Sequence, residues 1–92
     1  MALLSDEEIT ERLAGSDWER SGDEITREWT LADFAAALAF VDAVGAAAEA
    51  ANHHPDILLH GWNHVRLTLT NHSAGGLTDA DFALAAQIDE LA

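Results

Sequence analysis

Three histidines stand at the two ends of one short segment of this chain. His53 and His54 are adjacent and follow an alanine-rich stretch, whereas His72 closes an alternating run of polar and apolar residues. Histidine has the unperturbed side-chain pKa nearest neutrality, so it can donate or accept a proton at neutral pH. If the two ends of the segment meet in space, these imidazoles can act on opposite sides of one ligand. The spacing therefore predicts proton-transfer chemistry that needs neither a nucleophile nor a cofactor.

The adjacent pair, His53 and His54, has a chemistry of its own. Two neighbouring imidazolium charges repel, which favours at least one neutral ring that can accept a proton. Glu49 lies one helical turn before His53 and can fix its tautomer by accepting the ring N–H. The alternative interpretation of the pair is a polar cap that binds the last carbonyls of a helix.

His60 and His64 raise the further alternative of a metal site. Imidazole is a zinc ligand by type, but the segment 62–70 is interpreted as one strand that follows a bulge or tight turn at 60–61. Two residues four positions apart on an extended strand are separated by about 13 Å, which is too far for one ion without a bend. The chain has no cysteine, so a thiolate site is excluded. We therefore expect no metal.

Helical patterns flank the histidine segment. Ser5 and Glu8 have the spacing of a capping box at the start of a first helix. A second helix is predicted over 31–51 with Thr30 as its cap, and its many alanines leave a face of small side chains. Thr78 is predicted to cap a third helix. These helices would carry the histidines at their ends and cover a sheet.

Four short runs are predicted to be strands. Residues 18–21 and 25–29 form a hairpin around a Gly-Asp turn, 56–59 is a short strand after Pro55, and 62–70 alternates most clearly. Hairpins and helices without strict β-α alternation indicate the α+β class. We expect a single antiparallel-dominated sheet of about four strands with three helices on one face, in the order α-β-β-α-β-(β)-α.

Length and charge narrow the class of protein. Ninety-two residues are expected to form a single domain over 1–92. A formal charge of -13 with four basic residues argues against binding to nucleic acid or an anionic membrane. No apolar run is expected to reach the roughly 18 residues of a membrane span. The first residues lack the basic region of a signal peptide, so we expect a cytoplasmic protein.

Several of these residues together resemble the signature of the pterin-4a-carbinolamine dehydratases. They are Glu49, the run Asn52, His53, His54 and Pro55, the aromatic Trp62, His72 and Asp81. The run Gly-Leu-Thr before Asp81 is similar to the same family, and the resemblance extends over about 5–91. Two features depart from the pattern: the aromatic residue is tryptophan where tyrosine is familiar, and the spacing from His-His-Pro to this residue is on the long side. These departures concern substrate preference more than activity.

The resemblance implies a function for each of these residues. Members of the family dehydrate 4a-hydroxytetrahydropterins to quinonoid dihydropterins. Carried over, His53 and His72 exchange protons with the departing hydroxyl and with a ring nitrogen, and His54 helps to hold the pterin. The other residues of the signature, expected to bind substrate, are Glu49, Asn52, Pro55, Trp62 and Asp81. The resemblance does not assign which histidine is the acid and which is the base.

The resemblance also implies an assembly and an alternative function. It predicts a homodimer or homotetramer built through sheet edges and helices, which agrees with the alanine-rich helix. Relatives of this fold also act as dimerisation cofactors of transcription factors or as assembly factors for carbon-fixation enzymes. A non-catalytic interaction protein is therefore the alternative, and the presence of all three histidines favours the enzyme.

Overall fold

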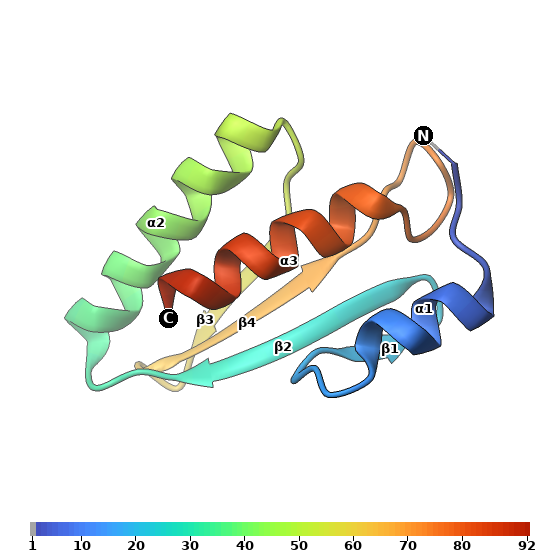
Figure 1. Ribbon diagram of the computed structural model, residues 1–92. Helices are drawn as coiled ribbons and strands as arrows, with labels where there is room; N and C mark the ends of the chain where they lie inside the picture. Colours follow the sequence, from blue (N-terminus) through green and yellow to red (C-terminus); the bar gives the residue numbers. More distant parts are fainter. Residues whose placement is uncertain (1) are drawn as a thin grey trace.

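The fold has three helices and a four-stranded sheet, described over residues 2–92 of this computed structural model (Figure 1). In chain order the elements are α1 (Asp6–Leu13), β1 (Glu19–Ser21), β2 (Glu24–Thr30), α2 (Phe34–Ala51), β3 (Asp56–His60), β4 (His64–Leu69) and α3 (Asp79–Leu91). All neighbouring strands are antiparallel, in the order β1-β2-β4-β3. The predicted α+β class, single sheet and order of elements are confirmed.

The hydrophobic core lies between one face of the sheet and the helices. Alternation along β4 turns Val65, Leu67 and Leu69 to this face, where each is 0% exposed, and β2 adds Ile25 and Trp29. All three helices contribute to the cluster, through Ile9, Ala37, Phe40, Val44, Ala48, Leu84, Ala85 and Ile88. The opposite face of the sheet is left open, as is common for antiparallel sheets.

Capping residues set the starts of α1 and α3 as the sequence predicts. Ser5 and Glu8 form the capping box, with reciprocal hydrogen bonds of 3.1 Å each. Thr78 is the N-cap residue of α3. Because α3 begins here, the residues of its first turn face the segment that leaves α2.

The predicted cap of α2 is wrong. Thr30 belongs to β2, where it is the register partner of His64. The helix begins three residues later than expected, and its cap is Asp33, whose side chain accepts the N–H of Ala36 at 2.8 Å. The tertiary pairing of two strands outweighs the local capping signal of a threonine.

The third and fourth strands form a hairpin, where the sequence predicted a bulge or tight turn at 60–61. The expected strand 62–70 begins only at His64, and β3 runs on to His60. Gly61 and Trp62 between them have φ values of 54° and 59°, so two successive left-handed residues reverse the chain. The tryptophan lies at the tip of this hairpin rather than in a strand.

Helix α2 is apolar along most of its length, and only part of it is buried. It is long and apolar enough to cross a membrane by length and composition alone, which corrects the expectation that no run reaches that length. The core helix of a globular protein passes the same test. Here 22% of the helix is buried, and Phe34 and Leu38 are 48% and 45% exposed. Its own chain therefore leaves an apolar surface uncovered.

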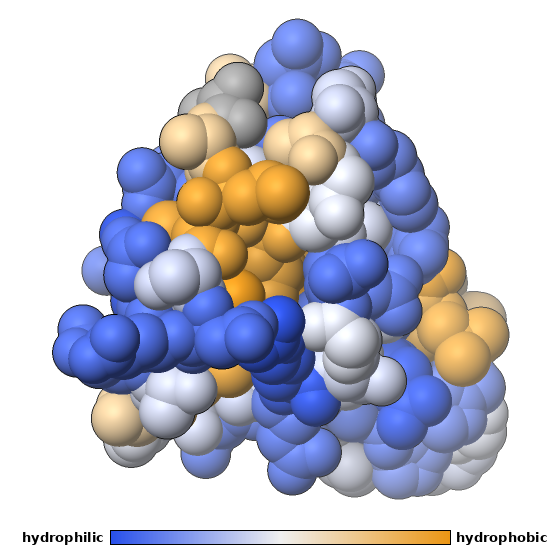
Figure 2. Space-filling model, turned by 90° about the vertical axis from the view of Figure 1, so that its right-hand side faces the viewer, coloured by the Kyte–Doolittle hydropathy of each residue, from blue (hydrophilic) through white to orange (hydrophobic). Residues whose placement is uncertain are grey.

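Charged side chains cover much of the remaining surface. Figure 2 looks at the side on which α1 lies and shows a central apolar area and a second one at the right-hand edge, within a mostly hydrophilic surface. Each of the four arginines lies within 4 Å of a carboxylate, as in the pairs of Arg12 with Asp79 and Arg20 with Asp6. The basic residues are thus already paired, and the excess acid remains as a net negative coat.

Candidate active site

The end of α2 is built so that His53 turns back toward α3. Asn52 adopts a left-handed conformation (φ 49°, ψ 43°), and its N–H donates to the carbonyls of Ala48 and Glu49. The N–H of His53 also donates to the carbonyl of Ala48, at 3.1 Å. This is a left-handed helix end of the kind that asparagine tolerates. Asn52 therefore has a structural role in placing the histidines.

His53 pairs with a carboxylate that is inaccessible to solvent. Its Nε2 atom lies 2.6 Å from Oδ1 of Asp81, and the two side chains are 13% and 0% exposed. A carboxylate is an acceptor, so in the neutral ring Nε2 carries the proton and Nδ1 is left as the acceptor. When the ring is protonated, both nitrogens donate and the carboxylate stabilises the positive charge. Asp81 thus fixes the tautomer of His53.

The first turn of α3 holds Asp81 in place. Its second oxygen, Oδ2, accepts the backbone N–H of Thr78 at 2.8 Å, and the hydroxyl of Thr78 lies 3.4 Å away. Asn71 donates from Nδ2 to the Thr78 hydroxyl at 3.5 Å. This chain of contacts links His53 to the residue directly before His72. Sequence spacing alone did not predict that Asp81 pairs with His53.

His54 has a different carboxylate, and this corrects the expected pairing. Glu49 was predicted to fix His53, but its Oε2 atom lies 2.5 Å from Nε2 of His54. Both side chains are open to solvent, at 59% exposed for His54 and 77% for Glu49. The left-handed residue before the pair turns His53 inward and leaves His54 on the outside, where it meets the last turn of α2.

The register of the sheet brings His54 and His72 to the same end of the molecule. Asp56 is the partner of Thr68 in the β3–β4 ladder, so His54 precedes and Thr70 follows the paired residues at the same end of the two strands. Figure 1 shows the start of β3 and the end of β4 at this end of the sheet. His72 is exposed in the loop after β4. It lines a hollow of about 360 Å³ with residues of the β1–β2 turn.

Within one chain, Trp62 lies apart from the predicted site histidines. It stands at the β3–β4 hairpin tip, at the other end of β3 from His54, and is 59% exposed. The five residues of β3 span roughly 16 Å at strand rise. Pro55 is half-buried and directly precedes β3, where it begins the extended chain. The fold of one chain therefore does not bring Trp62 to the histidines.

The hairpin brings His60 and His64 together, contrary to the expected separation of about 13 Å. They are register partners, and their rings stack with centroids 5.4 Å apart. Nε2 of His60 lies 2.7 Å from Oε1 of Glu28, whereas Nδ1 of His64 lies 3.1 Å from the hydroxyl of Thr30. Over residues 2–92, no three His, Asp or Glu side chains form a group that could hold a metal ion.

Replacing Glu28 with glutamine is expected to lower the melting temperature at neutral pH but not well below pH 4.5. The hydrogen bond with His60 lowers the pKa of Glu28 below its ordinary value of 4.5, and the charges of His60, Arg66 and His64 act in the same direction. A group with a lowered pKa in the folded state stabilises the fold above its unfolded pKa and loses this effect as pH falls through the folded value. Thermal unfolding of the wild-type protein and of the Glu28→Gln variant, from neutral pH to well below pH 4.5, tests this expectation. A difference that does not change with pH would contradict the linkage.

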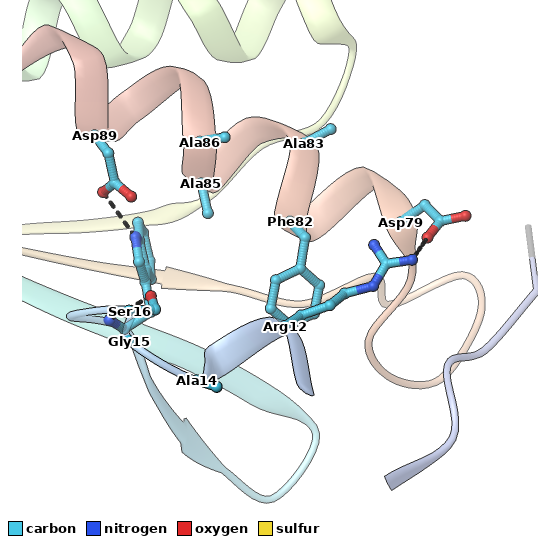
Figure 3. Close-up of a pocket in the computed structure, with 11 residues that line it drawn as sticks. Arg12, Ala14, Gly15, Ser16, Asp79, Phe82, Ala83, Ala85, Ala86 and Asp89 are labelled. Carbon is cyan, nitrogen blue, oxygen red and sulfur yellow. Dashed lines mark hydrogen bonds and ion pairs between the residues drawn. The ribbon is translucent and has the colours of Figure 1, made fainter. Parts of the chain in front are cut away.

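A separate hollow lies away from these histidines. It has a volume of about 690 Å³ between α1 and α3 (Figure 3). Arg12 and Asp79 form an ion pair at 2.5 Å on one side, and Trp18 donates from Nε1 to Asp89 at 2.8 Å on the other. Phe82 lies between them. Since none of the predicted site residues lines it, the candidate site is defined by its side chains and not by the size of a cavity.

Proteins similar in sequence share one family name. The family model for pterin 4 alpha carbinolamine dehydratase matches residues 2–91. A protein of Chloroflexus aurantiacus that carries this family name is 56% identical, and the match covers 99% of this chain and 98% of that protein. One of Nocardia farcinica with the same name is 57% identical, covering 98% and 95%.

Solved structures extend the likeness to the fold. The transcriptional coactivator/pterin dehydratase of Brucella melitensis superimposes with a TM-score of 0.90 at 30% identity, and the match covers 97% of each chain. A pterin dehydratase-like protein identified as a RuBisCO assembly factor in the alpha-carboxysome superimposes with a TM-score of 0.65 at 28% identity, covering 80% of this chain and 84% of that one. By its sequence over almost its whole length and by its fold, this chain belongs to the pterin 4 alpha carbinolamine dehydratase family.

Proposed function

We propose that this protein dehydrates 4a-hydroxytetrahydropterins to quinonoid dihydropterins by general acid and base catalysis. The observation that carries the proposal is the pair of His53 with the buried carboxylate of Asp81. A histidine held in one tautomer by a carboxylate presents its other ring nitrogen as a positioned proton acceptor or donor. That property is what an elimination of water requires.

The chemistry balances without an oxidant or a cofactor. The 4a-hydroxyl takes up a proton and leaves as water, and the neighbouring ring nitrogen loses its proton. A double bond then forms between this nitrogen and the carbon that carried the hydroxyl. We assign the two proton transfers to His53 and His72, which stand at the end of α2 and after the end of β4. Each such transfer contributes typically about 10²–10⁴-fold to a rate.

His54 and Glu49 are proposed to bind the pterin on the open side of the site. Their contact of 2.5 Å leaves Nδ1 of His54 free to contact a ligand. Both are largely exposed, so they can change rotamer when a ligand enters. Asn52 and Pro55 are proposed to act through the backbone, by setting the direction in which the chain leaves α2.

A homodimer or homotetramer is part of the proposal. Helix α2 has an exposed apolar face that includes Phe34 and Leu38, and burial of such a surface stabilises an assembly. The same surface also favours a second candidate function, a non-catalytic assembly factor. One structural neighbour is described as a RuBisCO assembly factor, and in such a function a partner protein would cover α2.

The test is the rate at which a 4a-hydroxytetrahydropterin disappears, followed by ultraviolet absorbance with and without purified protein. We expect acceleration in proportion to protein concentration. A folded protein that gives no acceleration, at low or high salt, would contradict the enzyme and favour the assembly factor. A parallel assay with a variant lacking His53 separates catalysis by this site from acceleration by a contaminant.

A further inference from the structure

The two edges of the sheet are not equivalent. At one edge, β1 is three residues long and fully polar, which are features that discourage pairing with another strand. At the other edge, β3 has five residues, no lysine and an uninterrupted register with β4. Ile57 and Leu58 on this strand are 38% and 51% exposed. An apolar edge strand of this kind is open to pairing with another chain.

The sequence of β3 is complementary to itself in the antiparallel sense. A two-fold axis through Leu58, perpendicular to the sheet, is the one placement that pairs all five residues of the strand. It sets Asp56 opposite the partner's His60, and Ile57 opposite the partner's Leu59. Residues directly opposite on antiparallel strands share a face, so an acid meets a histidine twice and apolar side chains meet between them. The charge pattern therefore fits a second copy of this chain.

The same axis also relates the two residues that one chain keeps apart. Residue numbers paired about Leu58 sum to a constant, so the position that corresponds to His54 is that of the partner's Trp62. Both lie two residues beyond the paired strand, at the same end of it. The hairpin tip of one subunit would thus stand beside the histidine pair of the other.

We infer that Trp62 of the partner subunit completes the pterin site around His54, so that each site is built from two chains. This inference rests on the proposed function and deepens it. The indole is 59% exposed and is held in a left-handed backbone conformation with φ 59°, which is rarely adopted by a bulky residue and marks a constrained position. A flat ring of this size stacks on a flat heterocycle such as a pterin.

The hairpin tip is rigid enough to present Trp62. Asn63, the next residue, donates from its side chain to the carbonyl of Leu31 at 3.0 Å and accepts the N–H of the same residue at 2.8 Å. These contacts attach the tip to the segment between β2 and α2. The position of the tryptophan is therefore fixed by the chain that carries it, while its indole is left for the partner subunit.

Mixed dimers test the inference directly. Subunits with His53→Ala and subunits with Trp62→Ala are given different tags, co-expressed and purified through both tags. In a mixed dimer, one site lacks both groups and the other has both, if Trp62 acts in the partner's site. Each variant alone is expected to be impaired, Trp62→Ala by roughly tenfold to a hundredfold, and the mixed dimer is expected to recover about half of the wild-type rate.

Other outcomes overturn the inference or the proposed function separately. A mixed dimer no faster than the mean of its parents would place Trp62 in its own chain's site, and wild-type activity of Trp62→Ala would remove it from any site. An inactive wild-type protein would instead contradict the proposed function. Trp62→Phe keeps an aromatic ring and should retain most activity. Leu58→Arg places two like charges at the axis, and should yield dissociated, folded subunits with little activity.

Discussion

Replacing His53 with alanine is expected to lower the rate of pterin dehydration by about 10²–10⁴-fold. The ring has one nitrogen fixed by Asp81 at 2.6 Å, so its other nitrogen is the best positioned proton donor or acceptor in the candidate site. The fold should persist, because His53 lies after the end of α2 and outside the hydrophobic core. A loss of stability of about 1–3 kcal/mol is expected from the unpaired carboxylate that remains.

A matched histidine outside the site is the control for this variant. His64→Ala removes an imidazole that stacks on His60 and contacts the hydroxyl of Thr30 on the open face of the sheet, and it should keep the wild-type rate. His54→Ala should raise KM more than it lowers kcat, because its proposed role is binding. Equal rates for His53→Ala and the wild type, measured on folded protein, would refute the assignment of the proton transfers.

Local signals predicted most of the fold. The capping box of α1, the β1–β2 hairpin and the start of α3 depend on residues three or four apart, and the structure has all of them. Two boundaries were wrong for different reasons. Thr30 is placed by its pairing with His64 in β4, and a contact over such a separation leaves no periodic signal in the sequence. The residues at 60–63 form a tight turn, in which Trp62 takes a left-handed conformation that a bulky residue rarely adopts.

The sequence predicted which residues form the candidate site more fully than it predicted which of them pair with one another. The pairing of Glu49 with His53 followed from helical spacing, but a left-handed Asn52 after the helix rotates the pair, and Glu49 meets His54 instead. Asp81 comes from 28 residues further along the chain, so its contact with His53 depends on how α3 packs. Trp62 could not be placed from the sequence, because the hairpin turn on which it sits was read as part of a strand.

Replacing Asp81 with asparagine is expected to lower the dehydration rate by at least about 10²-fold while the protein remains folded. An amide can still accept the N–H of Thr78, but it offers its NH₂ group to His53 where the carboxylate offered an acceptor. The imidazole must then carry its proton on the other nitrogen, which is the wrong tautomer for accepting one from the pterin. The free energy of unfolding should fall by about 1–3 kcal/mol as well.

The division of the loss between kcat and KM distinguishes a positioning role for Asp81 from a purely structural one. If the carboxylate orients the ring that transfers the proton, its removal should lower kcat and leave KM close to the wild-type value. Asp79→Asn is the matched control, because Asp79 stands in the same first turn of α3 but is 68% exposed and pairs with Arg12. An Asp81→Asn protein that loses kcat only in proportion to its unfolded fraction would mean that the carboxylate only supports the fold. A lower kcat at an unchanged KM, measured on folded protein, would establish that Asp81 acts through His53.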